Sequence, residues 1–215
     1  MHPSFTIMLT ENIVAAFLLV CLGCFFSVNL HNITLVHKRR GDAKSYAEVE
    51  RPSGFTMNLV AIGTLVYFLE ALLYSFLVFT DLIFVLPGFP FDFQFSFMVY
   101  MQVLGLILTS VGYFLFIWSV VARGRHAVSW EMPENQRLVT WGPYHYVRHP
   151  SYLGYFLMFF GLFFIWPNLF TLFPLLAIPG YFRATFEEEK LLAKRFGDEY
   201  LQYQNKTGRF FPKFR

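Results

Sequence analysis

Residues 142–152 read GPYHYVRHPSY, and the rest of the chain is organised around them. This stretch concentrates imidazole, phenol, guanidinium and proline between two long apolar regions rich in Phe, Leu and Val. Pro150 fixes its own φ and disfavours an α conformation at His149, so a helix is predicted to begin just after this proline. The first N–H groups of such a helix lack intrahelical partners and favour an anion. With Arg148 beside them, they predict a pocket for a small charged ligand at a membrane surface.

The composition is that of an integral membrane protein. Of the 215 residues, 56% are hydrophobic, 21% are aromatic and 14% are charged, whereas soluble domains carry about 25% charged residues. The length favours one domain, residues 1–215. The formal net charge of +3 is modest and indicates no particular partner.

The apolar runs predict an all-α, polytopic membrane protein with five transmembrane helices. The first run covers residues 13–30, with a start at 10–12 and an end at 32–40. The second and third cover 55–79 and 95–121, and we expect a loop at 81–94 between them.

The last two apolar runs, 152–166 and 169–182, predict a tight helical hairpin broken by Pro167 and Asn168. The first of them spans only about 22 Å at 1.5 Å per residue, less than the ~30 Å hydrocarbon core. A charged helical segment follows from Arg183, with Gly197 as its C-terminal cap and another turn or two after it.

The distribution of basic residues predicts the orientation. With five spans, all 17 Lys and Arg fall on one side, in groups at 38–51, 123–148 and 183–215. The opposite side carries only acids, Glu11, Asp81 and Asp92. Because cytoplasmic loops are rich in Lys and Arg, we expect the N-terminus outside and the C-terminus in the cytoplasm. The last hairpin then brings 123–152 and 183–215 together at the cytoplasmic edge of spans three to five.

Each chemically dense segment also has a purely structural interpretation. Arg148 and the tyrosines around it suit an interfacial belt as well as a ligand site, because Arg snorkels and Tyr favours membrane surfaces. His145 and His149 could ligate a metal, but Pro150 argues against one shared helical face, and we expect no metal. Cys21 and Cys24 lie in an apolar run and are expected to pack as small hydrophobes.

The acidic cluster Glu187–Glu189 is either a solvated helix face or part of a site. Helical spacing allows ion pairs of Glu187 with Arg183 and with Lys190, whereas Glu188 and Glu189 have no basic residue three or four positions away.

Glu70 lies in the middle of the second span, where an ionisable group is costly. It is either functional or a protonated or hydrogen-bonded side chain facing the bundle, and we favour the second interpretation.

Several of these residues together resemble the isoprenylcysteine carboxyl methyltransferase family. The resemblance rests on 138–144 (LVTWGPY), 147–154 (VRHPSYLG), 188–189 (EE) and 196–203 (FGDEYLQY). These motifs occur in the family's order with a hydrophobic hairpin between them, and they cover roughly the C-terminal two-fifths of the chain. The first three spans, 1–121, match only as membrane helices.

The resemblance implies that residues 122–215 bind S-adenosylmethionine. The cofactor-binding positions that it implies are Gln136, Arg137, Leu138, Val139, Tyr144, His149, Pro150, Ser151, Tyr152 and Glu188. It also implies catalytic roles for Glu188 and Arg183, with Arg183 binding the substrate carboxylate. The family often has His where Gln136 stands, and it has its arginine at the position of Ala184.

The implied function is carboxyl O-methylation of an isoprenylcysteine-like or other lipophilic acceptor. A carboxylate with a pKa of about 3.5 is already ionised, so methyl transfer to it needs alignment and desolvation but no general base. The alternatives are a phospholipid N-methyltransferase of the phosphatidylethanolamine type, a sterol-reductase-like enzyme that uses NADPH, and a non-catalytic scaffold. We expect a lipidated acceptor and membrane lipid as partners, no nucleic acid, and a prokaryotic plasma membrane in preference to the endoplasmic reticulum.

Overall fold

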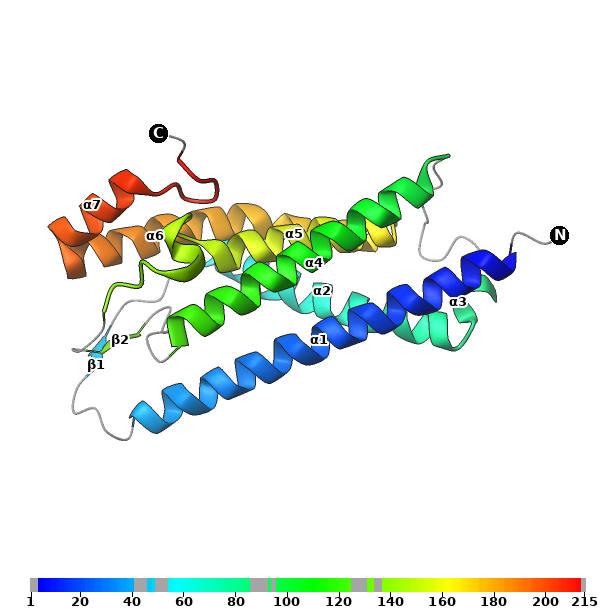
Figure 1. The fold of residues 1–215 in the computed structure, drawn as a ribbon, viewed down its shortest axis with the longest axis horizontal. Helices are drawn as coiled ribbons and strands as arrows, with labels where there is room; N and C mark the ends of the chain where they lie inside the picture. The colour runs from blue at the N-terminus through cyan, green and yellow to red at the C-terminus, as the bar shows by residue number, and fades with distance from the viewer. Residues whose placement is uncertain are drawn as a thin grey trace.

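The computed structural model describes residues 4–40, 46–48, 54–85, 93, 96–124, 131–133 and 137–213. Its long helices run side by side along one axis and form a bundle (Figure 1). They are α1 (Ser4–Arg40), α2 (Phe55–Phe79), α4 (Met98–Arg123), α5 (Pro150–Ile165) and α6 (Ile178–Phe196). The N-terminal end of α1 lies at one end of the bundle, and α7 (Asp198–Lys206) lies at the other. The prediction of a mainly helical membrane protein is confirmed.

Among the described residues, three helices are long and apolar enough to cross a membrane: Glu11–Leu35, Met57–Phe79 and Met98–Arg123. The second predicted run coincides with α2, and the third with α4 to within three residues at each end. The first helix is longer than expected at both ends, because no proline interrupts the chain from Ser4 to Arg40. The polar residues after position 31 do not end α1, which continues to Arg40.

The predicted hairpin is only partly regular. Helix α5, with 16 residues, is shorter than the three candidate spans. The return begins as a 3-10 helix, η3 (Phe170–Ala177), which contains Pro174, and continues directly into α6. The side chain of Asn168 fixes the turn: its Oδ1 accepts from the backbone N–H of Phe170 at 2.8 Å and of Thr171 at 3.1 Å. This asparagine therefore caps the orphan N–H groups at the start of η3.

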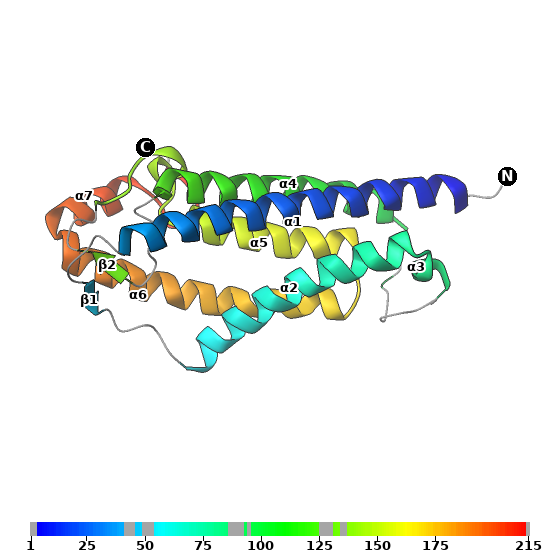
Figure 2. The same ribbon diagram turned by 90° about the horizontal axis from the view of Figure 1, so that it is seen from below.

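Two further differences concern segments that were expected to be loops. Residues Leu82–Val85 form a short helix, α3. Strands β1 (Tyr46–Glu48) and β2 (Glu131–Pro133) form a small antiparallel ribbon, so the all-α prediction needs this one correction. Figure 2 places α3 at the same end as the start of α1, and the ribbon at the end where α6 meets α7.

Glycines allow α4 and α5 to pack closely. A Cβ at Gly112 would lie 2.8 Å from the carbonyl oxygen of Gly154, and one at Gly105 would lie 2.7 Å from that of Gly161. The two glycines are seven residues apart on each helix, so both contacts fall on one face. Small residues at helix interfaces are the usual means of bringing membrane helices together, and this contact fixes where α5 begins relative to the end of α4.

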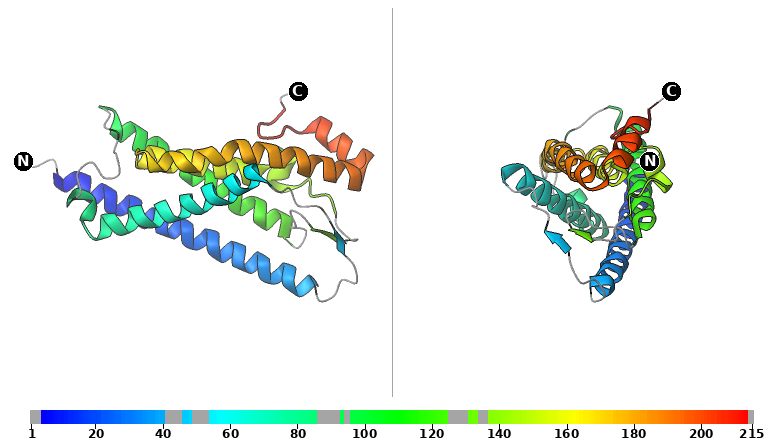
Figure 3. Two further views of the ribbon diagram at one scale, coloured as in Figure 1. Left: turned by 180° about the vertical axis from the view of Figure 1, so that it is seen from behind. Right: turned by 90° about the vertical axis from the view of Figure 1, so that its left-hand side faces the viewer.

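The interior of the bundle is largely aromatic. Tyr67, Phe159 and Leu18 are fully buried between helices, whereas Val20, Leu69 and many other apolar side chains lie on the outer surface. Seen along its axis, the bundle has α1 beside α2 and α4 (Figure 3). An apolar exterior around an aromatic core is the arrangement expected for helices surrounded by lipid.

Candidate functional site

The segment Gly142–His145, η2, is a short 3-10 helix that packs directly on the end of α4. Gly142 has a φ of 61°, and a Cβ there would lie 2.9 Å from the Cβ of Ala122. The indole Nε1 of Trp141 donates to the carbonyl of Ala122 at 2.9 Å. A residue without a side chain is therefore needed at position 142, both for the backbone turn and for the close contact.

The predicted helix start after His149 is confirmed, with Pro150 as the first residue of α5. His149 has a φ of −126° and a ψ of 59°, outside the helical range, as expected for a residue before proline. Its imidazole is buried beneath the polar end of the bundle and stacks on the ring of Tyr152, with centroids 5.7 Å apart and planes 6° apart.

The end of the chain closes over this motif. The backbone N–H of Arg148 donates to the carbonyl of Gly208 at 2.9 Å, and the N–H of His149 donates to that of Arg209 at 3.1 Å. The hydroxyl of Tyr203 in α7 donates to the carbonyl of Tyr144 at 2.6 Å. Residues 203–209 are therefore part of the site's framework; the sequence predicted that 183–215 would approach 123–152 but named no residue after Tyr203.

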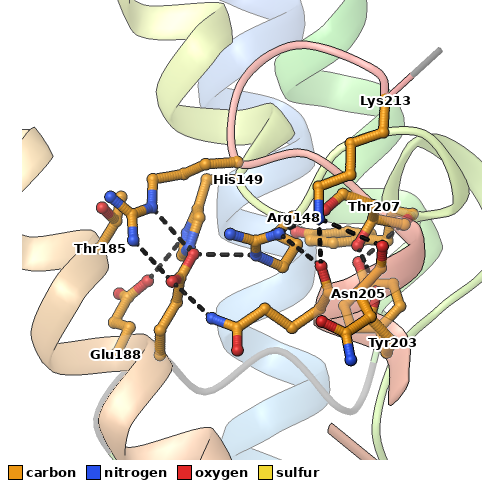
Figure 4. A network of polar contacts seen from close by, with 12 residues as sticks. Arg148, His149, Thr185, Glu188, Tyr203, Asn205, Thr207 and Lys213 are labelled. Carbon is orange, nitrogen blue, oxygen red and sulfur yellow. Dashed lines mark hydrogen bonds and ion pairs between the residues drawn. The ribbon is translucent and has the colours of Figure 1, made fainter. Parts of the chain in front are cut away.

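Glu189 is the centre of the polar network. Its carboxylate accepts from Nε of Arg148 at 2.9 Å, from Nε and Nη2 of Arg209 at 3.0 and 2.7 Å, and from Nε2 of Gln204 at 3.1 Å. It also lies 3.1 Å from Nε2 of His149. Figure 4 shows Arg148 and His149 side by side in this network, facing α6. One buried carboxylate thus joins α6, the motif, α7 and the C-terminal tail.

These contacts influence the charge states of Glu189 and His149. Burial alone would raise the pKa of Glu189, but hydrogen bonds from His149, Arg209 and Arg148 outweigh it and hold that pKa well below its usual value. Burial alone would lower the pKa of His149, but its bonds to Glu188 and Glu189 outweigh that effect and raise it. The favoured state is an imidazolium between two carboxylates.

Glu188 differs from Glu189 because fewer hydrogen bonds and ion pairs occupy its carboxylate. The hydroxyl of Tyr152 donates to its Oε1, and Nδ1 of His149 lies 3.4 Å from its Oε2. The side chain is 15% exposed, against 6% for Glu189. A carboxylate accepts about four hydrogen bonds, so Glu188 retains acceptor capacity toward a ligand.

Tyr144 lies buried beside this pair. Its hydroxyl interacts with Ser119 and Ser151, and burial is the main cause that raises the pKa of its phenol above the usual value. The phenol therefore stays neutral at physiological pH and serves as a hydrogen-bonding group.

The other residues that the resemblance implied differ in how far they are buried. Leu138 is buried and Val139 is partly buried on the way into η2, whereas Arg137 is exposed. Gln136 lies outside the described residues. The predicted proximity of His149, Tyr152 and Glu188 is confirmed.

The structure does not bring Arg183 to this group. Arg183 is exposed on α6, whereas the next two residues, Ala184 and Thr185, are buried. Five residues at 3.6 per turn place Arg183 about 140° around the helix from Glu188. The predicted ion pair of Glu187 with Lys190 is present, with 3.2 Å between Oε1 of Glu187 and Nζ of Lys190.

The sequence did not reveal the partners of Glu189. One signal was available: an acid next to the apolar hairpin with no base at helical spacing needs a partner from elsewhere. The bases in the tail, Arg209 among them, could have been considered for that role.

The remaining sequence candidates lie outside the polar network. Glu70 is buried in α2, and neither carboxylate oxygen has a hydrogen-bond partner among the described residues. Cys21 and Cys24 are free thiols. In the part of the chain that the structure describes, no three His, Cys, Asp or Glu side chains come together as metal ligands would.

Comparison with known proteins finds that the chain is similar to methyltransferases. Residues 100–199 match the family model described as phospholipid methyltransferase. The chain is 34% identical over 131 residues to a protein-S-isoprenylcysteine O-methyltransferase of Schizosaccharomyces pombe, covering 59% of this chain and 54% of the relative. It is 31% identical over 118 residues to the protein of that name in Homo sapiens, covering 53% of this chain and 42% of the relative.

A third relative of the same name, from Tribolium castaneum, is 32% identical over 120 residues, which are 51% of this chain and 41% of the relative. The matched region thus spans about half the length of these relatives or less. All three carry one name, and the family-model match at 100–199 overlaps the motifs at 138–203. The resemblance is confirmed: the chain is related to the isoprenylcysteine carboxyl methyltransferases.

Proposed function

We propose that this protein is an integral-membrane methyltransferase that uses S-adenosylmethionine to methylate the carboxylate of a lipophilic acceptor, such as an isoprenylated cysteine. The observation that carries the proposal is the unequal use of two adjacent carboxylates. Glu189 is saturated by charged partners, whereas Glu188 is partly exposed and held in place by Tyr152 and His149. A held acceptor with unused capacity suits the ammonium or ribose hydroxyls of the cofactor.

The residues present fit that cofactor. Glu188 would accept hydrogen bonds from its polar groups, and the N–H groups at the start of α5 would meet its carboxylate. The aromatic rings of Tyr144 and Tyr152 provide apolar surface next to these charges. When bound, the cofactor supplies an electrophilic methyl group on a sulfonium.

The chain's own task is to position and desolvate the acceptor. A carboxylate nucleophile needs no general base, so the buried and neutral Tyr144 and the fully paired Glu189 are compatible with this chemistry. Alignment of the two reacting atoms and exclusion of water are the contributions expected from the protein.

We also propose the membrane topology that the basic residues predict. The N-terminus would lie outside and the polar network at the cytoplasmic surface, with α5 and the η3–α6 segment as the fourth and fifth crossings. This places the polar site where a water-soluble cofactor enters, and the apolar helix surfaces where a lipid tail can approach.

Radiolabelled methyl transfer tests the function directly. The purified protein in lipid nanodiscs is incubated with methyl-labelled S-adenosylmethionine and N-acetyl-S-farnesylcysteine. We expect label in a base-labile ester, and loss of at least ~90% of the rate in Glu188→Gln, in keeping with the loss of a hydrogen bond to a charged group. No transfer by the unaltered protein to this or any other carboxylate acceptor would contradict the proposal.

A phospholipid N-methyltransferase is the second candidate, because the matching family model carries that description. It would need a base for the ammonium of its acceptor. The same assay with phosphatidylethanolamine separates the two functions, because label in an amine resists base whereas label in an ester does not.

A further inference from the structure

Arg123 is the last residue of α4, at the end of the bundle that carries α7 and the polar network (Figure 1). The segment that follows the β ribbon returns to this helix end, where Trp141 bonds the carbonyl of Ala122 and Gly142 packs on the Ala122 side chain. Because η2 and the start of α5 follow that segment, Arg123 lies at the same end of the bundle as Tyr144 and Tyr152.

The state of this guanidinium is unusual. Its Nε is buried and has no hydrogen-bond partner among the residues that the structure describes. Arg148 and Arg209, the arginines of the network, both direct Nε to Glu189 at 2.9 and 3.0 Å. An unpaired buried donor on a charged group is costly, more so than on a neutral one, so the site leaves one charged donor available to a ligand.

The electrostatic neighbours of Arg123 are the hydroxyls of the site. Its positive charge acts on Tyr144, Tyr152 and Tyr155. The negative charge of Glu188 acts on Tyr144 and Tyr152 as well. The tyrosines therefore lie within reach of one available cation and one partly used carboxylate, which suits two ligands of opposite charge.

We propose that Arg123 binds the carboxylate of the methyl acceptor, the role that the resemblance assigned to Arg183. This rests on the proposed function. A guanidinium fixes a carboxylate through two parallel N–H donors. Glu188 would then face the cationic groups of the cofactor and Arg123 the anionic acceptor, so that one carboxylate oxygen is turned toward the methyl group.

The reaction balances without a proton. The acceptor oxygen forms a bond to the methyl carbon while the bond from that carbon to sulfur breaks, and sulfur takes the electron pair. The carboxylate becomes a neutral ester and the sulfonium a neutral thioether. Arg123 thereby loses its anionic partner, which favours release of the ester over the acid.

Steady-state kinetics with N-acetyl-S-farnesylcysteine test this assignment. Arg123→Gln should raise the KM for the acceptor about 10- to 100-fold, the range expected for a lost bond between charged groups. The dissociation constant of S-adenosylmethionine, measured by calorimetry, should change less than about twofold, which also shows that the variant is folded. Arg123→Lys should recover part of the loss, and Lys194→Gln, an exposed cation on α6, should match the unaltered protein.

A binding experiment keeps the test independent of turnover. In the presence of S-adenosylhomocysteine, N-acetyl-S-farnesylcysteine should stabilise the unaltered protein against heat more than its carboxamide does, and Arg123→Gln should lose that difference. No difference between acid and amide in the unaltered protein would overturn the inference, as would a KM that rises in Arg183→Gln but not in Arg123→Gln.

Failure of the proposed function has a separate signature, because the unaltered protein would then transfer no methyl group to any carboxylate acceptor. If it binds the cofactor and methylates the acceptor while Arg123→Gln behaves identically, only the assignment of Arg123 fails.

Discussion

The two ends of the bundle each contain a carboxylate that ties distant parts of the chain together, but they use it differently. At one end, Glu189 meets Arg148, Arg209 and His149. At the other, Glu11 of α1 accepts from the hydroxyl of Tyr74 in α2 and from Nε2 of Gln102 in α4 at 2.7 Å.

Among the described residues, the charged partners of Glu189 gather where the motif, α6 and the C-terminal tail meet. The end of Glu11 has neutral donors, which hold helices together without offering charge to a ligand. We call Glu189 with Arg148, Arg209 and His149 the clamp, because this group positions the site. The hydrogen bonds of Glu11 only join helices. We therefore predict that substitutions at the two ends will differ in the size and in the kind of effect that they have.

The largest effect is expected at Glu189. Glu189→Ala leaves two arginines and a histidine without their shared partner, and the loss of one member of a buried ion pair costs about 3–5 kcal/mol. Thermal unfolding in detergent should show this as a fall in Tm of about 10 °C. Glu187→Ala, which removes the exposed pair with Lys190, is the matched control and should change stability by at most about 1 kcal/mol. Equal effects would mean that the clamp is no stronger than a surface pair.

The pH dependence of the clamp follows from His149. Its pKa is raised in the folded protein, so the stability that the imidazolium contributes is fully present below the unfolded pKa of about 6.5 and is lost as pH rises through the folded pKa. Glu189 has a lowered pKa and contributes above the unfolded value of about 4.5.

We therefore expect His149→Asn to destabilise the protein by about 1.5–3 kcal/mol near pH 6, and by less at pH 9. Unfolding curves of both proteins at the two pH values measure the difference. A gap that is constant or that widens with pH would show that the imidazole is neutral in the folded state.

The packing of α4 on α5 should be sensitive to a single methyl group. A Cβ at Gly154 would lie 2.8 Å from the carbonyl oxygen of Gly112 and 3.2 Å from the Cβ of Phe116. Gly154→Ala should cost about 1–3 kcal/mol and shift the start of α5, weakening the bond from Tyr152 to Glu188. Gly23→Ala, where nothing lies within 4 Å, is the control. A neutral Gly154→Ala would mean that the helices can separate at little cost.

The smallest effect is expected at the opposite end. Tyr74→Phe removes one hydrogen bond to Glu11 and should cost about 0.5–1.5 kcal/mol, with methyl transfer unchanged. Tyr100→Phe, an exposed tyrosine of α4, should cost nothing measurable. A loss of activity in Tyr74→Phe would break the division between the two ends.

Local rules predicted much of this molecule. Hydrophobic length identified α2 and α4, Pro150 marked the start of α5, and Gly197, with a φ of 53°, ends α6 as expected. The motif order anticipated that His149 and Glu188 would meet. These features depend on residues that are close in the chain, or on the end of the bundle to which each successive helix returns. Both can be read directly from a sequence.

What the sequence did not reveal depends on register between distant segments. The pairing of Val147 with Gly208 places Arg209 on Glu189, and no spacing rule links residues so far apart. Whether Arg123 and Arg183 face the site depends on where each residue falls around the axis of its helix, α4 or α6. A displacement of one residue, about 100° around a helix, separates the exposed Arg183 from the buried Ala184.

Calorimetric titration of the purified protein with S-adenosylmethionine tests the central claim most directly, with Glu188→Gln and Glu187→Gln as the paired variants. We predict binding by the unaltered protein, an affinity about tenfold or more weaker in Glu188→Gln, in line with the loss of a hydrogen bond to a charged group, and an unchanged affinity in Glu187→Gln. No binding by the unaltered protein, or equal affinities in all three, would contradict the account.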